Sequence, residues 1–451
     1  MSNSLFRKDA YGLYHYFEQI IEIRNDILNL NHARAQEIVT SKGLAAVTDE
    51  EIEFYKTYIH ESVHFIDSTS TLWGMEYTCR LYNCFNSNNS KEAIEVFLVN
   101  DSEIEQHAHS RIPTTTAFIE YRTMRSILSY NPRYGAYINF KYYSHDGNRF
   151  SEVFSTPLTM LALLEGHAYA QELLTALALF KSKDDPISTH LLKKEYEKTL
   201  IDTALSEYTC ILSFTEQLFD VYKFEERLSI VVLACRFVLD LPDLFPFPQA
   251  YIDSCFSNNT DEQIISAFKM ELNRGMNRSS LVAIILILLH CSLEAKPINT
   301  SSYEFSTELE NRIFELFAKE GESVESCKQT FKTLHDISYE TSLNLLHEKG
   351  AELAYLSALA NKDRDWLSFN PTEVALPCVL LTTGEFLSAN HELDYDIKKL
   401  VFSDDEKASE LTKRLKQEKV RKPHLRPTVC HDWLKKIESG EIGVHYYPED
   451  F

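Results

Sequence analysis

The hydrophobic residues of this chain recur mainly at the three- and four-residue spacing of amphipathic helices. This pattern predicts helices over 11–31 and about 100–130, and over a series of later segments: 192–218, 224–240, 261–274, 279–294, 305–320 and 324–361. Only 12 Gly and 13 Pro interrupt the 451 residues. Because these residues break helices, their scarcity also predicts a mainly α protein.

One stretch has the pattern of strands. In "YGAYINFKYYSHDGNRFSEVF", aromatic and β-branched residues flank Asp146-Gly147. An Asp-Gly pair between such segments is a strong signal for a tight hairpin turn. The sequence therefore predicts a small β element, a hairpin at about 136–155.

Capping residues mark the start of two further helices. Thr48 is followed three residues later by Glu51, which is the spacing of a capping box, and the helix that it opens is predicted over about 49–85. Thr156-Pro157 combines an N-cap residue with a proline suited to the first turn. It predicts a second helix over about 157–180.

Composition and charge narrow the classes of function. The formal net charge of −22 is opposite to what a phosphate-binding surface needs, so nucleic acid is an unlikely partner. The nine cysteines are scattered without a C-x-x-C pair, which is typical of reduced thiols in a cytoplasmic protein.

No membrane segment is expected from the sequence. The first twenty residues lack the basic start and the apolar run of a signal peptide. The most apolar run, Leu281–Cys291, is shorter than the about 20 residues that span a bilayer, so it is interpreted as a buried core helix.

The first of the capped helices carries the sequence His60-Glu61-Ser62-Val63-His64. Residues four apart lie on one face of a helix, so His60 and His64 can direct two imidazoles at one point. Neutral imidazoles are good zinc ligands, and two of them supply half of a tetrahedral site. A carboxylate beside them, such as Glu61, can take a proton from water without being a ligand.

Chance is the competing explanation for this motif. The chain has 16 His, and two of them can fall four apart on a helix without binding anything. Ile59, Val63 and Ile66 flank the motif at core-facing spacing, which favours a position inside a packed helix rather than in a loop. This placement favours the metal site over chance.

The second capped helix offers further ligands in "LLEGHAYAQELL". Glu165 and Glu172 are two turns apart on one face of a strongly apolar helix. A buried acid needs a partner, a proton or a metal ion. Gly166 and Ala168 keep the surface beside Glu165 small, so that another helix can approach.

The two segments together resemble the gluzincin metallopeptidases. H-E-x-x-H is followed on a later helix by E-G-x-A-x-x-x-E, which is similar to the E-G-F-A-x-Y-x-E helix of the zinc aminopeptidases. The resemblance implies a zinc ion held by His60, His64 and Glu165, with Glu61 as general base. Glu172 would then be a carboxylate that orients a ligand histidine.

The resemblance covers about 35 residues, and the chain departs from the family pattern in two ways. About a hundred residues separate the two segments here, against about twenty in the zinc aminopeptidases and the thermolysin group. Tyr169 stands where thermolysin-like enzymes have an aspartate. Insertion of the hairpin between the helices accounts for the longer separation, and by analogy 136–155 would supply the edge strand that holds a substrate backbone in zincins.

Other residues are open candidates for parts of such a site. His167 is an alternative third ligand, although two residues of helix turn it away from the face of Glu165. Three histidines could contact substrate or oxyanion: His107, His109 and His145. Two tyrosines could stabilise an oxyanion: Tyr196 and Tyr208.

Two further interpretations were weighed. A di-iron carboxylate bundle also uses E-x-x-H, but it needs two such pairs, and only His64 has a Glu three residues before it. The basic stretch 413–427 is interpreted as a solvated helix face and loop, with docking to nucleic acid or to an acidic partner surface as the alternative.

The expected protein is a mainly α, cytoplasmic zinc metallopeptidase with a zincin-like core. Its catalytic region spans 1–240, followed by a helical region over 241–395 and a charged helical segment over 396–451. Its partners would be a protein or peptide substrate and a possible regulatory protein, without a membrane. The alternative is a helical interaction or effector protein with a structural or vestigial zinc site.

Overall fold

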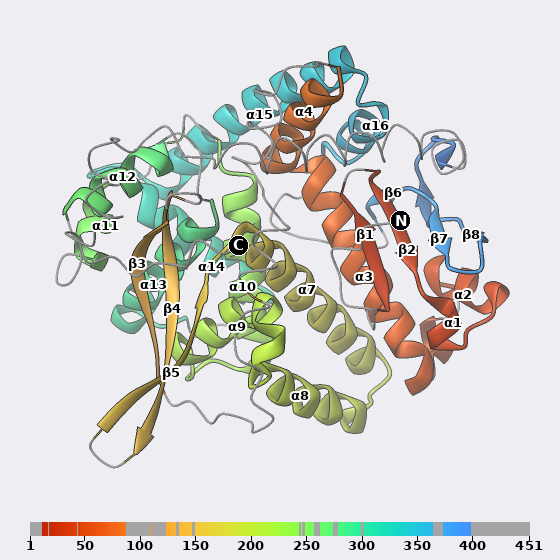
Figure 1. Ribbon diagram of the computed structural model, residues 1–451, viewed down its shortest axis with the longest axis horizontal. Helices are drawn as coiled ribbons and strands as arrows, with labels where there is room; N and C mark the ends of the chain where they lie inside the picture. Colours follow the sequence, from red (N-terminus) through yellow and green to blue (C-terminus); the bar gives the residue numbers. More distant parts are fainter. Residues whose placement is uncertain are drawn as a thin grey trace. The chain divides into compact units, whose positions relative to one another are not determined.

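The computed structural model is shown in Figure 1. It describes residues 11–16, 18–42, 44–86, 109, 123–131, 135–146, 149–242, 245, 249–256, 262–273, 278–298, 302–363 and 373–397. The described part is mainly helical with small sheets, as the sequence predicted. The predictions for His107, for the basic stretch 413–427 and for nearly all of 396–451 lie outside the described residues.

The helices are α1 (Asn25–Leu28), α2 (His32–Val39), α3 (Asp49–Ser70), α4 (Leu72–Asn86), α7 (Met160–Ser182), α8 (Pro186–Leu200), α9 (Ser206–Leu218), α10 (Phe224–Leu239), α11 (Gln249–Phe256), α12 (Glu262–Asn273), α13 (Arg278–Ala295), α14 (Ser302–Phe317), α15 (Val324–Lys349) and α16 (Glu352–Ala360). The strands are β1 (Gly12–His15), β2 (Ile20–Ile23), β3 (Thr123–Asn131), β4 (Gly135–Asp146), β5 (Arg149–Pro157), β6 (Ala375–Leu376), β7 (Val379–Leu381), β8 (Phe386–Leu387) and β9 (His391–Glu392).

The chain divides into two compact units, each built from separate stretches. The first unit draws on Met1–Val96, His167–Lys194 and Ile337–Arg421, and the second on Phe97–Gly166, Glu195–Asp336 and Lys422–Phe451. One division falls inside α7, which is a continuous helix. The regions predicted from the sequence were each one continuous stretch of the chain, whereas each of these units combines separate stretches.

The first unit contains a sheet in the order β1-β2-β7-β8. β1 pairs with β2 antiparallel, and β2 pairs with β7 in parallel, as Glu22 opposite Leu380. Helix α3 packs against β1 and β2 (Figure 1). The helix predicted over 11–31 is therefore wrong for most of its length, because β1 and β2 pair with each other along their whole length and the distant β7 adds a second partner for β2.

Helix α3 begins as predicted but ends early. The backbone N–H of Thr48 donates to Glu51 Oε2 at 2.8 Å, as a capping box requires. The helix predicted over 49–85 breaks at Thr71, whose hydroxyl donates to the carbonyl of Asp67 at 2.5 Å and accepts from the N–H of Gly74 at 3.0 Å. A β-carbon at Gly74 would lie 2.1 Å from that carbonyl oxygen, so α4 can begin this close to α3 only with glycine there.

The first unit has an apolar cluster where α4 meets α15 and α16. Its buried members are Leu72, Met75, Cys79, Tyr339, Leu343, Leu346, Ala351, Ala354 and Ala358. The Tyr339 hydroxyl donates to the carbonyl of Ala358 at 2.8 Å, so the one polar atom of that ring is satisfied within the cluster.

The second unit contains the antiparallel sheet β3-β4-β5, on which α12 packs (Figure 1). Asp146 pairs with Arg149 across the turn of β4 and β5, which confirms the predicted hairpin. The helix predicted over 100–130 is wrong at Thr123–Asn131, which is strand β3 and pairs with β4 along its whole length.

The start predicted for the second capped helix is also wrong. Pro157 ends strand β5, where it lies opposite Asn139 at the edge of the pairing. The helix begins at Met160 instead, and the Thr159 hydroxyl accepts from the N–H of Ala162 at 3.1 Å. The N-cap is therefore the second threonine of "TPLT", because Pro157 still belongs to the sheet.

Helix α13 contains the apolar run that the sequence analysis interpreted as a core helix. Among the described helices it alone has the length and composition needed to cross a bilayer, and 67% of that segment is buried within the protein. Leu281, Ile284 and Ile285 are buried, and α13 packs on α10 and α14 of the same unit. In this structure the run is a core helix.

Candidate metal centre

The two histidines of the H-E-x-x-H segment lie one turn apart on α3 and converge. The Nε2 atoms of His60 and His64 are 3.1 Å apart, and the rings meet edge to face with centroids 4.8 Å apart. Both side chains are buried, with exposed fractions of 8% and 0%. Packing of α3 against the sheet thus buries a face that carries two imidazoles.

Glu165 of α7 completes a group of three possible ligands. One ligand atom from each of His60, His64 and Glu165 can be chosen such that all three lie within 4.8 Å of one another. Glu165 is 1% exposed. The sequence predicted this trio from two segments about a hundred residues apart.

The spacing of the nitrogen atoms suits a tetrahedral ion. Ligand atoms at about 2.0–2.1 Å from zinc are roughly 3.3 Å apart at the tetrahedral angle, close to the observed 3.1 Å. The donor set of two imidazoles and one carboxylate is also the set that zinc binds. The residues therefore fit a zinc ion by chemistry and by spacing.

A carboxylate fixes the tautomer of His60. Its Nδ1 lies 3.1 Å from Oε2 of Glu172, on the same helix as Glu165. An ionised carboxylate only accepts hydrogen bonds, so Nδ1 carries the hydrogen and Nε2 keeps the lone pair that a metal needs. Glu172 thus lies where the predicted orienting role requires it.

A buried lysine supports this carboxylate. The Nζ atom of Lys56, one turn before His60 on α3, lies 3.6 Å from Oε1 of Glu172. Burial raises the pKa of Glu172, but the hydrogen bond from His60 and the charge of Lys56 outweigh burial and hold that pKa below its usual value. Glu172 is therefore ionised beside His60.

Aromatic residues that the sequence analysis missed surround His64. The Tyr16 hydroxyl lies 3.2 Å from Nδ1 of His64, and the Tyr14 ring stacks near the imidazole with centroids 6.3 Å apart. The Tyr14 hydroxyl bonds to Ser68 at 2.5 Å. The alternation of Tyr14 and Tyr16 was a strand signal, but the helical interpretation of 11–31 obscured it.

Glu61 lies against the end strand of the sheet. Its side chain is 5% exposed. A β-carbon built on Gly12 of β1 would lie 2.7 Å from Glu61 Oε1 and 2.5 Å from Thr57 Cγ2. Glycine is thus what lets β1 run directly beside the predicted general base.

The alternative site residues have other partners. His167 Nδ1 lies 2.7 Å from Oδ2 of Asp67, so His167 is engaged by Asp67 and is not a member of the trio. The Tyr196 hydroxyl donates to Glu216 at 2.9 Å. Tyr208 lies in α9, and His145 lies in β4 with a side chain outside the described part.

His109 is fully engaged by hydroxyl groups. Its Nδ1 lies 2.9 Å from Ser206 Oγ and 3.1 Å from Thr156 Oγ1, and its Nε2 lies 3.1 Å from Thr159 Oγ1. Burial lowers the pKa of His109 to about 3, against a small opposing effect of Glu165. His109 is therefore a neutral imidazole with both nitrogens hydrogen-bonded, and its role in the second unit is structural.

Comparison of the chain with protein families, with curated proteins and with solved structures finds no significant match.

Proposed function

We propose that this protein is a zinc-dependent metallopeptidase with His60, His64 and Glu165 as metal ligands. The observation that carries the proposal is the buried group of these three side chains on α3 and α7. In the part of the chain that the structure describes, three protein ligands form the group, which leaves a tetrahedral ion one position for water or substrate. That number is typical of catalytic rather than structural zinc sites.

The chain's own residues have separate roles in this mechanism. When bound, zinc supplies Lewis-acid activation of water and of the scissile carbonyl. Glu61 adjoins the ligand His60 and takes the proton of the attacking water, then passes it to the leaving amine. Glu172 holds His60 in the tautomer that exposes Nε2, and Lys56 keeps Glu172 ionised.

The strand for the substrate backbone is β1 in this proposal. Strand β1 is at the end of the described sheet, packs on α3 and lies beside Glu61 through Gly12. The hairpin at 136–155, to which the analogy with zincins assigned this role, is instead paired within β3-β4-β5. An extended peptide adds to the edge of a sheet through main-chain hydrogen bonds, and β1 is the end strand that lies beside Glu61.

One observation favours the alternative of a non-catalytic zinc protein. His60, His64, Glu165 and Glu61 are all at least 92% buried, and a substrate must reach them for catalysis. In that case the ion would stabilise the contact of α3 with α7, and the helical surfaces would bind a partner. Activity of the metal-loaded protein distinguishes the two candidates.

The first experiment is elemental mass spectrometry of the purified protein beside a His60→Ala/His64→Ala variant. The proposal expects about one zinc per chain, lost in the double variant. No zinc in the native protein, even after reconstitution at neutral pH, would overturn both the peptidase and the structural zinc candidate.

The second experiment tests catalysis with Glu61→Gln, which removes the base and keeps every ligand. New peptide termini are labelled in a cytoplasmic extract incubated with zinc-loaded protein. The peptidase proposal expects termini that appear with the native protein and not with Glu61→Gln. Equal termini from both proteins would refute the role of Glu61, and a zinc-loaded protein that cleaves nothing would favour the non-catalytic candidate.

A further inference from the structure

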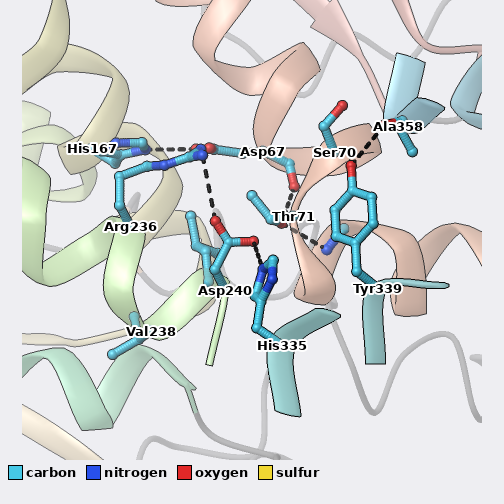
Figure 2. A network of polar contacts seen from close by, with 12 residues as sticks. Asp67, Ser70, Thr71, His167, Arg236, Val238, Asp240, His335, Tyr339 and Ala358 are labelled. Carbon is cyan, nitrogen blue, oxygen red and sulfur yellow. Dashed lines mark hydrogen bonds and ion pairs between the residues drawn. The ribbon is translucent and has the colours of Figure 1, made fainter. Parts of the chain in front are cut away.

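A second polar contact joins α3 to α7 beside the metal group. Oδ2 of Asp67 and Nδ1 of His167 are 2.7 Å apart, and both side chains are completely buried (Figure 2). A contact this short and dry between a carboxylate and an imidazole is a strong, directional hydrogen bond. Neither residue belongs to the predicted ligand set.

The position of this pair along the two helices is informative. Asp67 lies three residues after His64 on α3, and His167 lies two residues after Glu165 on α7. About two turns earlier on α3, the ligand His60 bonds to Glu172 of α7. The two contacts connect the same two helices; on α3 they enclose His64, and on α7 the nearer one is two residues from Glu165.

Asp67 is itself held firmly by its own backbone surroundings. Its carbonyl oxygen accepts from the Thr71 hydroxyl at 2.5 Å, at the corner where α3 ends (Figure 2). Gly74 packs against the same carbonyl, with room for no β-carbon. The corner fixes the last turn of α3, so the Asp67 carboxylate meets His167 from a rigid position.

We propose that Asp67 and His167 form a positioning pair that sets the register of α3 against α7 and thereby brings His64 and Glu165 to one metal ion. The inference rests on the proposed zinc site. A slip of one helix along the other by one residue moves a side chain by about 1.5 Å, which is enough to spoil a coordination distance. Two contacts at separate points along the same pair of helices prevent both sliding and pivoting, whereas His60–Glu172 alone would leave a pivot.

The test measures zinc affinity by competition with a chromophoric chelator, together with the visible spectrum of the Co²⁺-substituted protein. Asp67→Ala and His167→Gln each remove the contact and no ligand. Both are expected to lower zinc affinity about 10–100-fold, the range found for groups that orient metal ligands. The Co²⁺ bands should also shift or weaken, because they report the arrangement of ligands around the ion.

Asp67→Asn is the conservative variant. Its amide oxygen can still accept from His167, so it should retain more zinc affinity than Asp67→Ala and a Co²⁺ spectrum closer to that of the native protein. Tyr339→Phe is the matched control, because it also removes a buried hydrogen bond in the first unit, to Ala358. It is expected to lower stability without changing either metal readout.

The outcomes separate this inference from the proposed function. If the native protein binds zinc tightly, and Asp67→Ala, His167→Gln and Tyr339→Phe all match it in affinity and in Co²⁺ spectrum, the positioning role is wrong and the zinc site stands. If Tyr339→Phe loses as much affinity as the other two variants, the effect is general instability, and the inference also fails. A native protein without zinc affinity overturns the inference together with the proposed site.

Discussion

Gly12 and Glu61 are in direct contact, the glycine on strand β1 and the glutamate on helix α3. A β-carbon at Gly12 would lie 2.7 Å from Glu61 Oε1 and 2.8 Å from Glu61 Cγ. Real side chains do not approach this closely, so any other residue would push the strand or the carboxylate aside. The proposed general base thus depends on a glycine almost fifty residues earlier in the chain.

Gly12→Ala is expected to lower the free energy of unfolding by about 1–3 kcal/mol, because it overpacks the contact of β1 with α3. Urea unfolding measures this difference. The control is Gly166→Ala on α7, where the added β-carbon would lie 3.6 Å from Ile211, an ordinary contact. Replacing this helical glycine should raise stability by about 0.5–1 kcal/mol. Equal effects at the two glycines would contradict the close contact at Gly12.

Glu172→Gln is expected to weaken zinc binding about 10–100-fold, because a neutral amide orients His60 less firmly and makes its Nε2 a poorer donor. Isothermal calorimetry in the presence of a competing chelator measures the affinity. Glu76→Gln is the control, since Glu76 forms a partly exposed ion pair with Arg80 on α4. The orienting role of Glu172 is excluded if both variants bind zinc as the native protein does.

Leu346→Ala is expected to destabilise the first unit by about 2–5 kcal/mol, because it leaves a cavity in a packed core. Leu346 is 0% exposed in the cluster of α4, α15 and α16. Its neighbour Leu345 is 38% exposed, so Leu345→Ala should change stability by less than about 0.5 kcal/mol. Denaturant midpoints of the two variants provide the comparison, and similar midpoints would contradict the placement of α15.

His109 makes stability depend on pH. Burial lowers its folded pKa from 6.5 to about 3, so between these pH values the unfolded chain binds a proton that the folded chain does not. The protein therefore has its full stability, with respect to His109, above pH 6.5. As the pH falls from 6.5 toward 3, protonation of His109 in the unfolded chain lowers the free energy of unfolding. The expected loss between pH 7 and pH 5 is about 2 kcal/mol from this residue.

The measurement compares urea unfolding of the native protein and of His109→Gln at several pH values. Other histidines titrate in both proteins, so the difference between the two slopes isolates His109. A native slope no steeper than that of His109→Gln would show that the buried imidazole takes up its proton in the folded protein as readily as in the unfolded chain.

The sequence correctly predicted those structural features that depend only on residues close together in the chain. The Thr48–Glu51 capping box is a bond between residues one turn apart, and the Asp146-Gly147 hairpin needs only its own two strands. Several helices, such as α10 and α13, lie within two residues of their predicted bounds, because their apolar spacing covers the whole element. The trio of His60, His64 and Glu165 was predicted from the resemblance of the two segments, taken together, to the gluzincin metallopeptidases.

The errors have causes at different distances along the chain. Strand β2 pairs along its whole length with β1 and also with β7, more than three hundred residues later, whereas the isolated stretch 11–31 is also compatible with a helix. Helix α7 begins at Met160 because pairing with β4 extends β5 through Pro157. Helix α3 ends at Ser70 because Thr71 and Gly74 close against Asp67.

The types and spacing of the possible ligands were therefore determined by the sequence, since one helical turn places His60 and His64 together in any context. Tertiary structure decided what surrounds them. Gly12 and Tyr16 approach the group through the packing of β1 on α3, and the Asp67–His167 pair through a side-chain contact between α3 and α7. Such contacts depend on where whole elements meet, and no local pattern of side chains records that.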